Sequence, residues 1–449
     1  MNEPLEIKAK LHMRLRSWLA DDALRRLFGN VLVLLGGKAF NALFSLGTMT
    51  LAVRALGLET YGVLILIHAF AMTAADLGKF QSWQAVLRYG TSAVKEDRLD
   101  DFRRLIRFTL LLDAGSALAA TVVAMTGAWL IGPRLGWPTE VIPLGVLYGF
   151  SVIFAVTATP TGLLRLYDRF DLLAIQNNVG SLVRLIGSAI VFLAGGGLPA
   201  FIAVWFVARA ASGISLFLFG WREMRRHGHG GTGAVGWRGL TKPFDGIWRF
   251  VWSTNLNTTA NLGFVHLATL LTGGLLGPEE AGLFRIARQV ANALAKPARL
   301  FIQVVYPEFA RLVAAGDLRQ LRRLLRRLAG LSAGGTAVGL LLLVVFGPLL
   351  LRLIGGEAAL AAYPILLWLS GAALIDLWAF PLEPALISLG RAGTALMVRA
   401  TATAVSIPFL ILAVRHFGLT GAGITALATA LLLLIGQFLP TLRAFEARQ

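Results

Sequence analysis

The residues in this sequence best suited to chemistry are cations on one face of a long apolar helix expected at 280–312. Six polar side chains recur there at intervals of three or four residues: Arg285, Arg288, Asn292, Lys296, Arg299 and Gln303. At about 100° per residue they fall within an arc of roughly 60°. A charge at the centre of a bilayer costs about 2.5–3.5 kcal/mol or more, so this stripe cannot face lipid. It offers neutralisation of an anion inside the membrane.

Further cations lie within other apolar segments of the chain: Lys38, Arg184, Arg209 and Arg399. The acids available to pair with the intramembrane bases are fewer: Asp76, Asp113, Glu308, Asp376 and Glu383. The excess of bases predicts a central cavity that prefers an anion, with all of these cations as substrate-binding candidates. An alternative stays open for Arg285 and Arg299, whose long side chains can extend to opposite membrane interfaces.

Uncharged polar residues are expected to line the same cavity, and the candidates are Asn41, Asn177, Asn261 and Asn292. Asp76 and His266 are the candidates for coupling transport to an ion gradient. For His266, a hydrogen bond to a neighbouring helix is the preferred interpretation. The sequence contains no phosphate-binding Gly-rich loop with Lys-Ser/Thr and no paired spacing of metal ligands. It therefore predicts a protein without catalytic residues, cofactor or metal.

The composition indicates which solvent surrounds these residues. Of the 449 residues, 56% are apolar and 15% are charged, and the mean hydropathy is +0.70. A chain so apolar is typical of a protein solvated by lipid. The formal net charge of +18 would suggest nucleic acid in a soluble protein, but here we expect no nucleic-acid partner. Cysteine is absent, which excludes disulfides and thiolate metal sites.

Apolar segments of about 20 residues predict an all-α membrane protein of about twelve helices in two pseudo-symmetric six-helix bundles. The expected spans are 30–54, 60–79, 105–131, 140–163, 171–194, 198–221, 247–274, 280–312, 328–354, 360–387, 392–414 and 418–441. The expected domains are an N-terminal bundle at 29–222, a polar cytoplasmic connector at 223–246 and a C-terminal bundle at 247–449. Residues 1–28 favour an interfacial amphipathic helix, with a partly ordered basic tail as the open alternative.

The distribution of basic residues predicts the orientation. With a cytoplasmic N-terminus, only four of the 42 Lys and Arg residues fall in the outer turns: Arg54, Arg134, Arg352 and Arg415. The positive-inside rule therefore favours a multi-pass membrane protein with both termini in the cytoplasm. The outer turns are short, which leaves no room for the catalytic domain of a membrane glycosyltransferase or polymerase. A scaffold protein would leave the intramembrane cations unexplained.

An internal repeat supports the two-bundle organisation. When the chain is shifted by 220 positions, identities align as Asn41 with Asn261, Phe44 with Phe264, Leu51 with Leu271, Leu56 with Leu276, Gly57 with Gly277, Glu59 with Glu279 and Gly62 with Gly282. In each copy an apolar run ends in a Leu-Gly-x-Glu turn and a second apolar run follows. Duplication of this kind is typical of secondary transporters.

Two basic runs extend the repeat, Phe102-Arg-Arg-Leu105 and Leu321-Arg-Arg-Leu324, each leading into the third helix of its half. They could bind anionic lipid headgroups. Topology anchoring is the preferred interpretation.

The turn motifs resemble a known family. The segment Arg54-Ala-Leu-Gly-Leu-Glu-Thr-Tyr-Gly62 is similar to the Arg-x-Leu-Gly-Pro-Glu-x-Tyr-Gly signature of Wzx-type polysaccharide flippases, which belong to the multidrug/oligosaccharidyl-lipid/polysaccharide exporter superfamily. The segment Leu276-Gly-Pro-Glu-Glu-Ala-Gly-Leu-Phe284 resembles its counterpart in the second half. Leu58 replaces the expected proline in the first copy, and Ala281 replaces the aromatic residue in the second.

This resemblance implies a flippase of the bacterial inner membrane that moves a polyprenyl-pyrophosphate-linked oligosaccharide from the cytoplasmic to the outer leaflet by alternating access. It implies that the basic cavity binds the pyrophosphate while the lipid tail stays in the bilayer, and that other polysaccharide-assembly proteins are candidate partners. Two alternatives stay open. A cation-coupled multidrug antiporter of the same superfamily would require an acidic cavity, and a lipid II-type flippase typically has two further helices.

Overall fold

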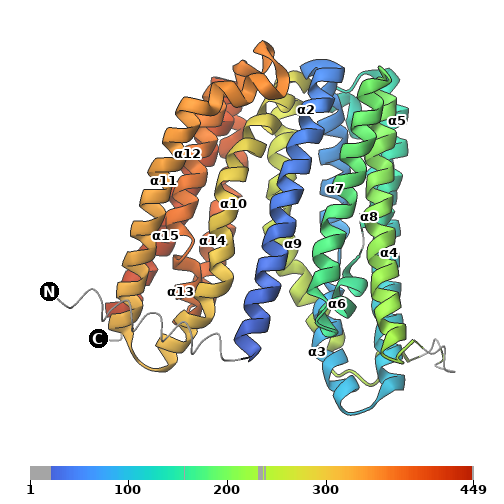
Figure 1. Cartoon of the computed structure of the whole chain (residues 1–449), viewed down its shortest axis with the longest axis vertical. Helices are drawn as coiled ribbons and strands as arrows, with labels where there is room; N and C mark the ends of the chain where they lie inside the picture. Colours follow the sequence, from blue (N-terminus) through green and yellow to red (C-terminus); the bar gives the residue numbers. More distant parts are fainter. Residues whose placement is uncertain (1–21, 156, 231–235, 237–238, 447–449) are drawn as a thin grey trace.

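The protein is a bundle of long, nearly parallel helices in two groups (Figure 1). The computed structural model describes the backbone of residues 22–155, 157–230, 236 and 239–446. It also describes their side chains, except at 22–39, 155, 256–265, 294–308, 310, 314, 331–333, 335–337 and 392. Every regular element in these ranges is helical. The predicted all-α membrane fold of about twelve spans in two six-helix bundles is confirmed.

The N-terminal bundle supplies the first six spans. α2 holds spans 1 and 2, α4 is span 3, α5 to α6 form span 4, and α7 and α8 are spans 5 and 6. The bounds are α2 (Asp22–Gly78), α3 (Ser82–Lys95), α4 (Leu99–Ile131), η1 (Gly132–Leu135), η2 (Thr139–Val141), α5 (Ile142–Gly149), η3 (Phe150–Ala155), α6 (Ala158–Leu166), α7 (Phe170–Leu193) and α8 (Leu198–Arg226). Residues 1–21 of the predicted interfacial segment 1–28 lie outside the described residues. The remaining residues, 22–28, form the beginning of α2.

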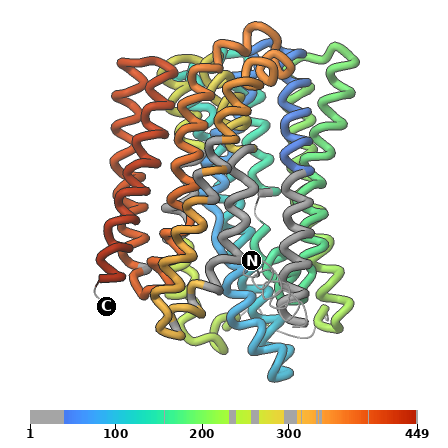
Figure 2. Tube along the Cα trace, turned by 60° about the vertical axis from the view of Figure 1, so that its left-hand side comes forward, coloured from blue at the N-terminus to red at the C-terminus, as the bar shows by residue number. Residues whose placement is uncertain are grey.

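The C-terminal bundle follows the same order. α9, α10 and α11 are spans 7 to 9, α12 and α13 together form span 10, and α14 and α15 are spans 11 and 12. The bounds are α9 (Ile247–Leu276), α10 (Pro278–Ala314), α11 (Leu318–Gly355), η4 (Glu357–Ala362), α12 (Tyr363–Ala379), α13 (Leu382–Ser388), α14 (Ala392–Phe417) and α15 (Leu419–Glu446). In Figure 2, α15 and α14 (red) lie at one flank of the molecule, and α3 (light blue) extends past the ends of its neighbours.

The repeated Leu-Gly-x-Glu motif forms a tight turn in both bundles. Gly57 has φ 75°, ψ 170° and Gly277 has φ 108°, ψ 172°, a region that only glycine enters readily. The chain therefore reverses at these two positions without a loop. Glu59 and Glu279 follow in the first turn of the next helix, where a carboxylate interacts favourably with the helix dipole. We call the end of the molecule that carries these two turns the hairpin end.

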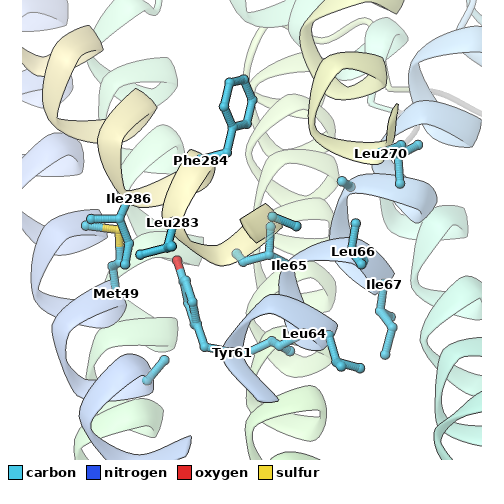
Figure 3. Packing of buried hydrophobic residues seen from close by; sticks show 14 of the residues in the cluster. Met49, Tyr61, Leu64, Ile65, Leu66, Ile67, Leu270, Leu283, Phe284 and Ile286 are labelled. Atoms are coloured by element: carbon cyan, nitrogen blue, oxygen red, sulfur yellow. The ribbon is translucent and has the colours of Figure 1, made fainter. Parts of the chain in front are cut away.

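The two bundles pack closely at the hairpin end. Gly62 lies so close to the other bundle that a methyl group on it would be 1.7 Å from the carbonyl oxygen of Pro278. One continuous core of buried apolar residues crosses the junction between the bundles. Figure 3 shows Met49 and Tyr61 of α2 facing Leu283 and Ile286 of α10. Main-chain proximity and apolar burial together hold the two hairpins against each other.

Two spans are interrupted, which the apolar runs did not predict. The span expected at 140–163 consists of α5, η3 and α6, and the span expected at 360–387 breaks between α12 and α13 at residues 380–381. Pro160 stands in the first turn of α6 and Pro381 lies in the second break. Both prolines favour an interruption of the helix, because proline removes a backbone donor and disfavours a helical conformation of the residue before it. α4 and α11 also begin earlier than expected, so both basic runs lie on helices and not in loops.

A buried carboxylate stabilises the first of these breaks. Asp113 of α4 is 4% exposed. It accepts hydrogen bonds from the Ser82 hydroxyl at 2.5 Å and from the Thr159 backbone N–H at 2.7 Å. Ser82 opens α3 and Thr159 lies in the first turn of α6. One side chain thus satisfies donors at the beginnings of two helices that the sequence keeps far apart.

Candidate functional site: a cationic cavity in the N-terminal bundle

A polar cavity of about 340 Å³ lies among α2, α7 and α8, with one residue contributed by α9. Its described lining residues are His68, Met72, Ala75, Asp76, Lys79, Phe154, Thr157, Gln176, Asn177, Gly180, Ser181, Arg184, Trp205, Ala208, Arg209, Ser212 and His266. Five residues predicted from the sequence as site residues are among them: Asn177, Arg184, Arg209, Asp76 and His266.

The cavity is positively charged. Of its described lining residues, Lys79, Arg184 and Arg209 are cations, and Asp76 is a carboxylate. If both lining histidines are neutral, the formal charge of this set is +2. A cation excess inside a low-dielectric slab attracts an anion strongly, because the Coulomb energy rises as the effective dielectric constant falls.

Two of the lining side chains have donors with no internal partner. The Nε atom of Arg184 and the Nε1 atom of Trp205 are buried, and within the described part of the chain neither finds an acceptor. The guanidinium carbon of Arg184 lies 5.1 Å from the centre of the Trp205 ring, which holds the two groups together through a cation–π contact. Because buried donors are normally paired, these two are suited to a ligand oxygen.

The other arginine of the cavity is positioned from α8. Arg209 directs a guanidinium nitrogen to the sulfur of Met72, 2.7 Å away. The thioether is a weak acceptor and carries no charge, so it orients Arg209 without neutralising it. The close approach of α8 to α7 depends on Gly180, where a methyl group would lie 3.0 Å from the Ala208 carbonyl oxygen.

Hydrogen bonds between helices fix the walls of the cavity. Asn41 donates from its amide to the Asn177 carbonyl oxygen at 2.9 Å and to the Ser181 hydroxyl at 2.7 Å. The amide of Gln176 donates to Ser212 at its hydroxyl, 2.9 Å, and at its carbonyl, 3.0 Å. α2 is therefore tied to α7, and α7 to α8, by polar contacts at membrane depth. In this structure Asn41 supports the wall through Asn177 and Ser181.

His68 of α2 also lines the cavity. Its Nδ1 lies 2.7 Å from the Tyr148 hydroxyl, and its ring packs edge-on against Trp205 with centroids 4.8 Å apart. These contacts fix the indole against which Arg184 lies.

Asp76 and His266 connect the two bundles across the cavity. The Nε2 atom of His266 on α9 lies 3.6 Å from the Oδ2 atom of Asp76 on α2. Both side chains are about four-fifths buried, with exposed fractions of 19% and 20%. Together they form a titratable contact between two bodies that must move relative to each other in any alternating-access cycle.

The polar stripe at residues 285–303, which lies on α10, reaches this site in part. Arg285 lies close enough to His68, Arg184 and His266 to interact electrostatically with each of them. Arg288 also acts on His266, and its guanidinium lies 5.8 Å from the Phe284 ring centre. Asn292 is half-buried on the same helix. The side chains of Lys38, Asn261, Lys296 and Arg299 lie outside the described part of the structure, so their predicted place in the cavity stays a prediction.

Arg399 lies apart from the other cations. It lines a separate pocket of about 660 Å³ in the C-terminal bundle, together with Asp376 and Gln437. It forms an ion pair there with Glu383 of α13. The structure therefore does not bring Arg399 together with Arg184 and Arg209, and a role in substrate binding stays a prediction.

Sequence reasoning missed three contributors to the cavity: Lys79, His68 and Gln176. Lys79 is the last residue of the span expected at 60–79 and was not counted among the intramembrane cations, and in the structure it directly follows the end of α2 at Gly78. His68 and Gln176 are single polar residues whose direction depends on how the helices pack. Within the described residues, no group of His, Cys, Asp and Glu is placed to hold a metal ion.

Comparison with known proteins agrees with this architecture. An inward-facing multidrug resistance transporter of the MATE family aligns with a TM-score of 0.74 at 13% identity, covering 93% of this chain and 98% of the other. An outward-facing MATE transporter gives a TM-score of 0.61 at 15% identity, with 94% and 96% covered. A Pyrococcus furiosus transporter, described as having a binding pocket of reverse polarity, gives 0.61 at 14% identity, with 93% and 96% covered. The fold is that of the multidrug/oligosaccharidyl-lipid/polysaccharide exporter superfamily of membrane transporters.

Sequence comparison places the chain more closely. Residues 27–313 match the family described as "Polysaccharide biosynthesis protein". The inner membrane protein YghQ of Escherichia coli strain K12 is 32% identical over 354 residues, which cover 78% of this chain and 99% of that protein. The chain belongs to the polysaccharide biosynthesis protein family, within the superfamily that the turn motifs predicted, and it is a multi-pass inner membrane protein.

Proposed function

We propose that the protein moves a polyprenyl-pyrophosphate-linked oligosaccharide across the inner membrane, with the pyrophosphate bound in the cationic cavity. The observation that carries this proposal is the excess of Lys79, Arg184 and Arg209 over Asp76 among the described lining residues. Membership of the polysaccharide biosynthesis family supports the glycan part of the substrate. The isoprenoid tail would remain in the bilayer outside the two bundles.

The chemistry of a pyrophosphate suits this cavity. Arginine forms charge-assisted hydrogen bonds to phosphate oxygens, which are about twice as strong as bonds between neutral groups. The free Nε atom of Arg184 and the neighbouring indole N–H of Trp205 supply donors without breaking any described internal bond. The thioether beside Arg209 leaves the charge of that side chain available.

The contacts between the two bundles support a mechanism of alternating access. At the opposite end, the start of α9 packs on α3 and α4, as in the contact of Phe108 with Trp248. At the hairpin end, Arg54 donates to the Leu353 carbonyl oxygen at 2.8 Å and Gly62 packs on Pro278. The positive-inside rule predicts that this end is the outer one. Closure there supports an inward-facing state, in which the predicted bundles 29–222 and 247–449 would rock around the cavity to expose it outside.

A multidrug antiporter is the alternative that the MATE-like fold favours. A cationic drug requires carboxylates in the binding site, and Asp76 is the acid among the described lining residues. It already lies within reach of His266 and beside Lys79. The charge balance of this cavity therefore favours an anionic substrate.

Reconstitution into liposomes tests the proposal. Translocation of polyprenyl-pyrophosphate oligosaccharide would be compared between the wild type, Arg184→Gln/Arg209→Gln and Arg415→Gln, an exposed residue in the last turn of α14. Loss of charge-assisted bonds predicts transport at least about tenfold slower in the double variant, and unchanged transport in the Arg415 control. A second pair, Arg288→Ala/Lys296→Ala, tests the stripe on α10 in the same assay.

Two outcomes would reject the proposal. If the cavity variants transport normally while the protein remains folded, the substrate passes elsewhere. If the wild type moves no lipid-linked glycan but exports cationic dyes, the protein is a drug antiporter and the cations of the cavity serve another purpose.

A further inference from the structure

A second hollow on the molecule combines an apolar groove with two arginines. The groove has a volume of about 800 Å³ and runs between α11 and α15, and the break that separates α12 from α13 forms part of its lining. Its apolar wall includes Ala329, Trp378, Leu382, Ile435, Phe438 and Leu439. Arg322 and Arg326 line the same groove and also an adjoining basic depression of about 880 Å³.

The position of the groove matches one leaflet of a bilayer. Arg322, Leu325, Arg326 and Ala329 share one face of α11, and the step from Arg322 to Ala329 rises about 10 Å along the helix. On α15 the lining extends from Leu434 to Phe445, about 16 Å. The hydrocarbon part of a single leaflet is about 15 Å thick. The groove therefore runs through about one leaflet, with its cations at the end opposite to the hairpin end.

The large apolar side chains of the groove are open to the surroundings. Ile435 is 54% exposed and Phe438 is 47% exposed, so the groove is not filled by the protein's own core. Arg322 and Arg326 are exposed as well, and within the described part of the chain neither forms an ion pair with an acid. The combination of two uncompensated cations and an apolar trough is complementary to an anionic amphiphile.

The internal repeat supplies a comparison within the same molecule. In the N-terminal bundle the equivalent run carries Arg103 and Arg104, which pair with Asp100 at 3.0 Å and with Asp101 at 3.9 Å. Arg319 and Gln320 stand where those two acids would be, so the first turns of α11 carry uncompensated charge.

The apolar side is covered in one copy and open in the other. In the N-terminal bundle, Phe108 on α4 is buried under Leu240, Phe244 and Ile247 of the connector and α9. Topology anchoring by the positive-inside rule explains the basic residues at the start of α4 and of α11. It does not require a groove beside either of them. The groove and the missing acids are specific to the C-terminal copy.

We propose that the α11–α15 groove binds an anionic glycerophospholipid of the leaflet opposite the hairpin end. Its phosphate contacts Arg322 and Arg326, and an acyl chain lies along Ile435, Phe438 and Leu439. The site is separate from the cationic cavity, which lies among α2, α7 and α8. A lipid at this place fills the space between the ends of α11 and α15, so it stabilises the C-terminal bundle.

Lipid binding by the purified full-length protein tests this site without reference to transport. Phosphatidylglycerol or phosphatidylcholine would be titrated into detergent, and binding followed by native mass spectrometry and by the melting temperature. At about 1 kcal/mol per arginine near an anionic surface, Arg322→Gln/Arg326→Gln is expected to weaken phosphatidylglycerol binding about 30-fold. The control variant Arg103→Gln/Arg104→Gln, in the equivalent run of the N-terminal bundle, is expected to leave this binding unchanged.

A second pair of variants tests the apolar half of the site. Ala329→Phe places a ring in the groove, and it should remove the tightly bound lipid. Gly330→Phe lies one residue further along α11, where no neighbour lies within 4 Å, and should retain it. Equal loss in the Arg103/Arg104 variant, or equal binding of phosphatidylcholine, would reduce the arginines to topology anchors and overturn the proposal. Displacement of phosphatidylglycerol by lower concentrations of a polyprenyl phosphate would also overturn it, by assigning the groove to an isoprenoid.

Discussion

Gly62 and Gly282, equivalent positions in the two repeats, lie against each other where the bundles meet. A methyl group added to Gly282 would lie 3.5 Å from both the N and the Cα of Gly62, and 3.0 Å from the Leu58 carbonyl oxygen. Each repeated hairpin therefore packs its glycine on the backbone of the other. This contact explains why the motif retains a glycine five residues after its turn in both halves.

Gly62→Ala is expected to weaken this contact strongly. The added methyl group would lie 1.7 Å from the Pro278 carbonyl oxygen, so the backbone must move, at a cost of about 1–3 kcal/mol. We expect a lower melting temperature in detergent. We also expect faster labelling of a cysteine introduced at Arg54, which would be unique in a chain that has none.

The control is Gly115→Ala on α4, where nothing lies within 4 Å. It should be neutral or slightly stabilising, because alanine favours a helix more than glycine does. Equal effects of the two substitutions would contradict close packing at Gly62.

Asp113→Ala is expected to lower the free energy of unfolding by about 1–3 kcal/mol for each donor left buried without an acceptor. The donors are the Ser82 hydroxyl and the Thr159 backbone N–H. Asp113→Asn keeps one acceptor and should cost less. Ser116→Ala, one turn along α4, removes only a bond to the Asp113 carbonyl oxygen and serves as the control in thermal unfolding. A melting temperature for Asp113→Ala equal to the control would show that the carboxylate does not hold the break.

Asp76→Asn and His266→Gln test whether the contact between the bundles couples transport to protons. If it does, both variants should lose the acceleration that an imposed pH gradient gives, while exchange without a gradient continues. The measurement is lipid translocation in proteoliposomes with and without the gradient. His416→Gln, an exposed histidine in the last turn of α14, is the control. Retention of gradient dependence in both variants would remove Asp76 and His266 as coupling residues.

The Arg399–Glu383 ion pair allows a structural role to be separated from substrate binding. Glu383→Gln is expected to lower the free energy of unfolding by about 1.5–3 kcal/mol, the range for hydrogen bonds to charged groups. The exchange Glu383→Arg/Arg399→Glu should restore stability. Transport is the second readout: recovery in the exchanged protein indicates a structural pair, and continued loss indicates that the cation at position 399 contacts substrate.

The sequence predicted the helices well and the site only in part, for physical reasons that differ. Each span needs about 20 apolar residues to cross lipid, and that requirement is visible in composition. The break between η3 and α6 and the break at residues 380–381 are not visible in composition. The donors at the first break are satisfied by Asp113, more than 40 residues away in the sequence.

Helical periodicity located candidate cations but not their neighbours. Arg184 and Arg209 share a cavity, whereas Arg399 faces Glu383 in the other bundle. The spacing of residues along one helix says which share a face, and only the packing of helices decides which face meets which. Lys79 shows the reverse error, since this cation at the end of an apolar run was not among the site candidates and yet lines the cavity.

The glycine contact at the hairpin end has a consequence for how such proteins diversify. Closure there depends on main-chain shape at Gly62, Pro278 and Gly282 and on apolar packing around them, and not on the charged residues of the cavity. The residues that we propose to bind cargo lie elsewhere, on α7, α8 and the far part of α2. If the cavity binds the cargo, mutation there can alter what is carried without changing the contact that closes the hairpin end.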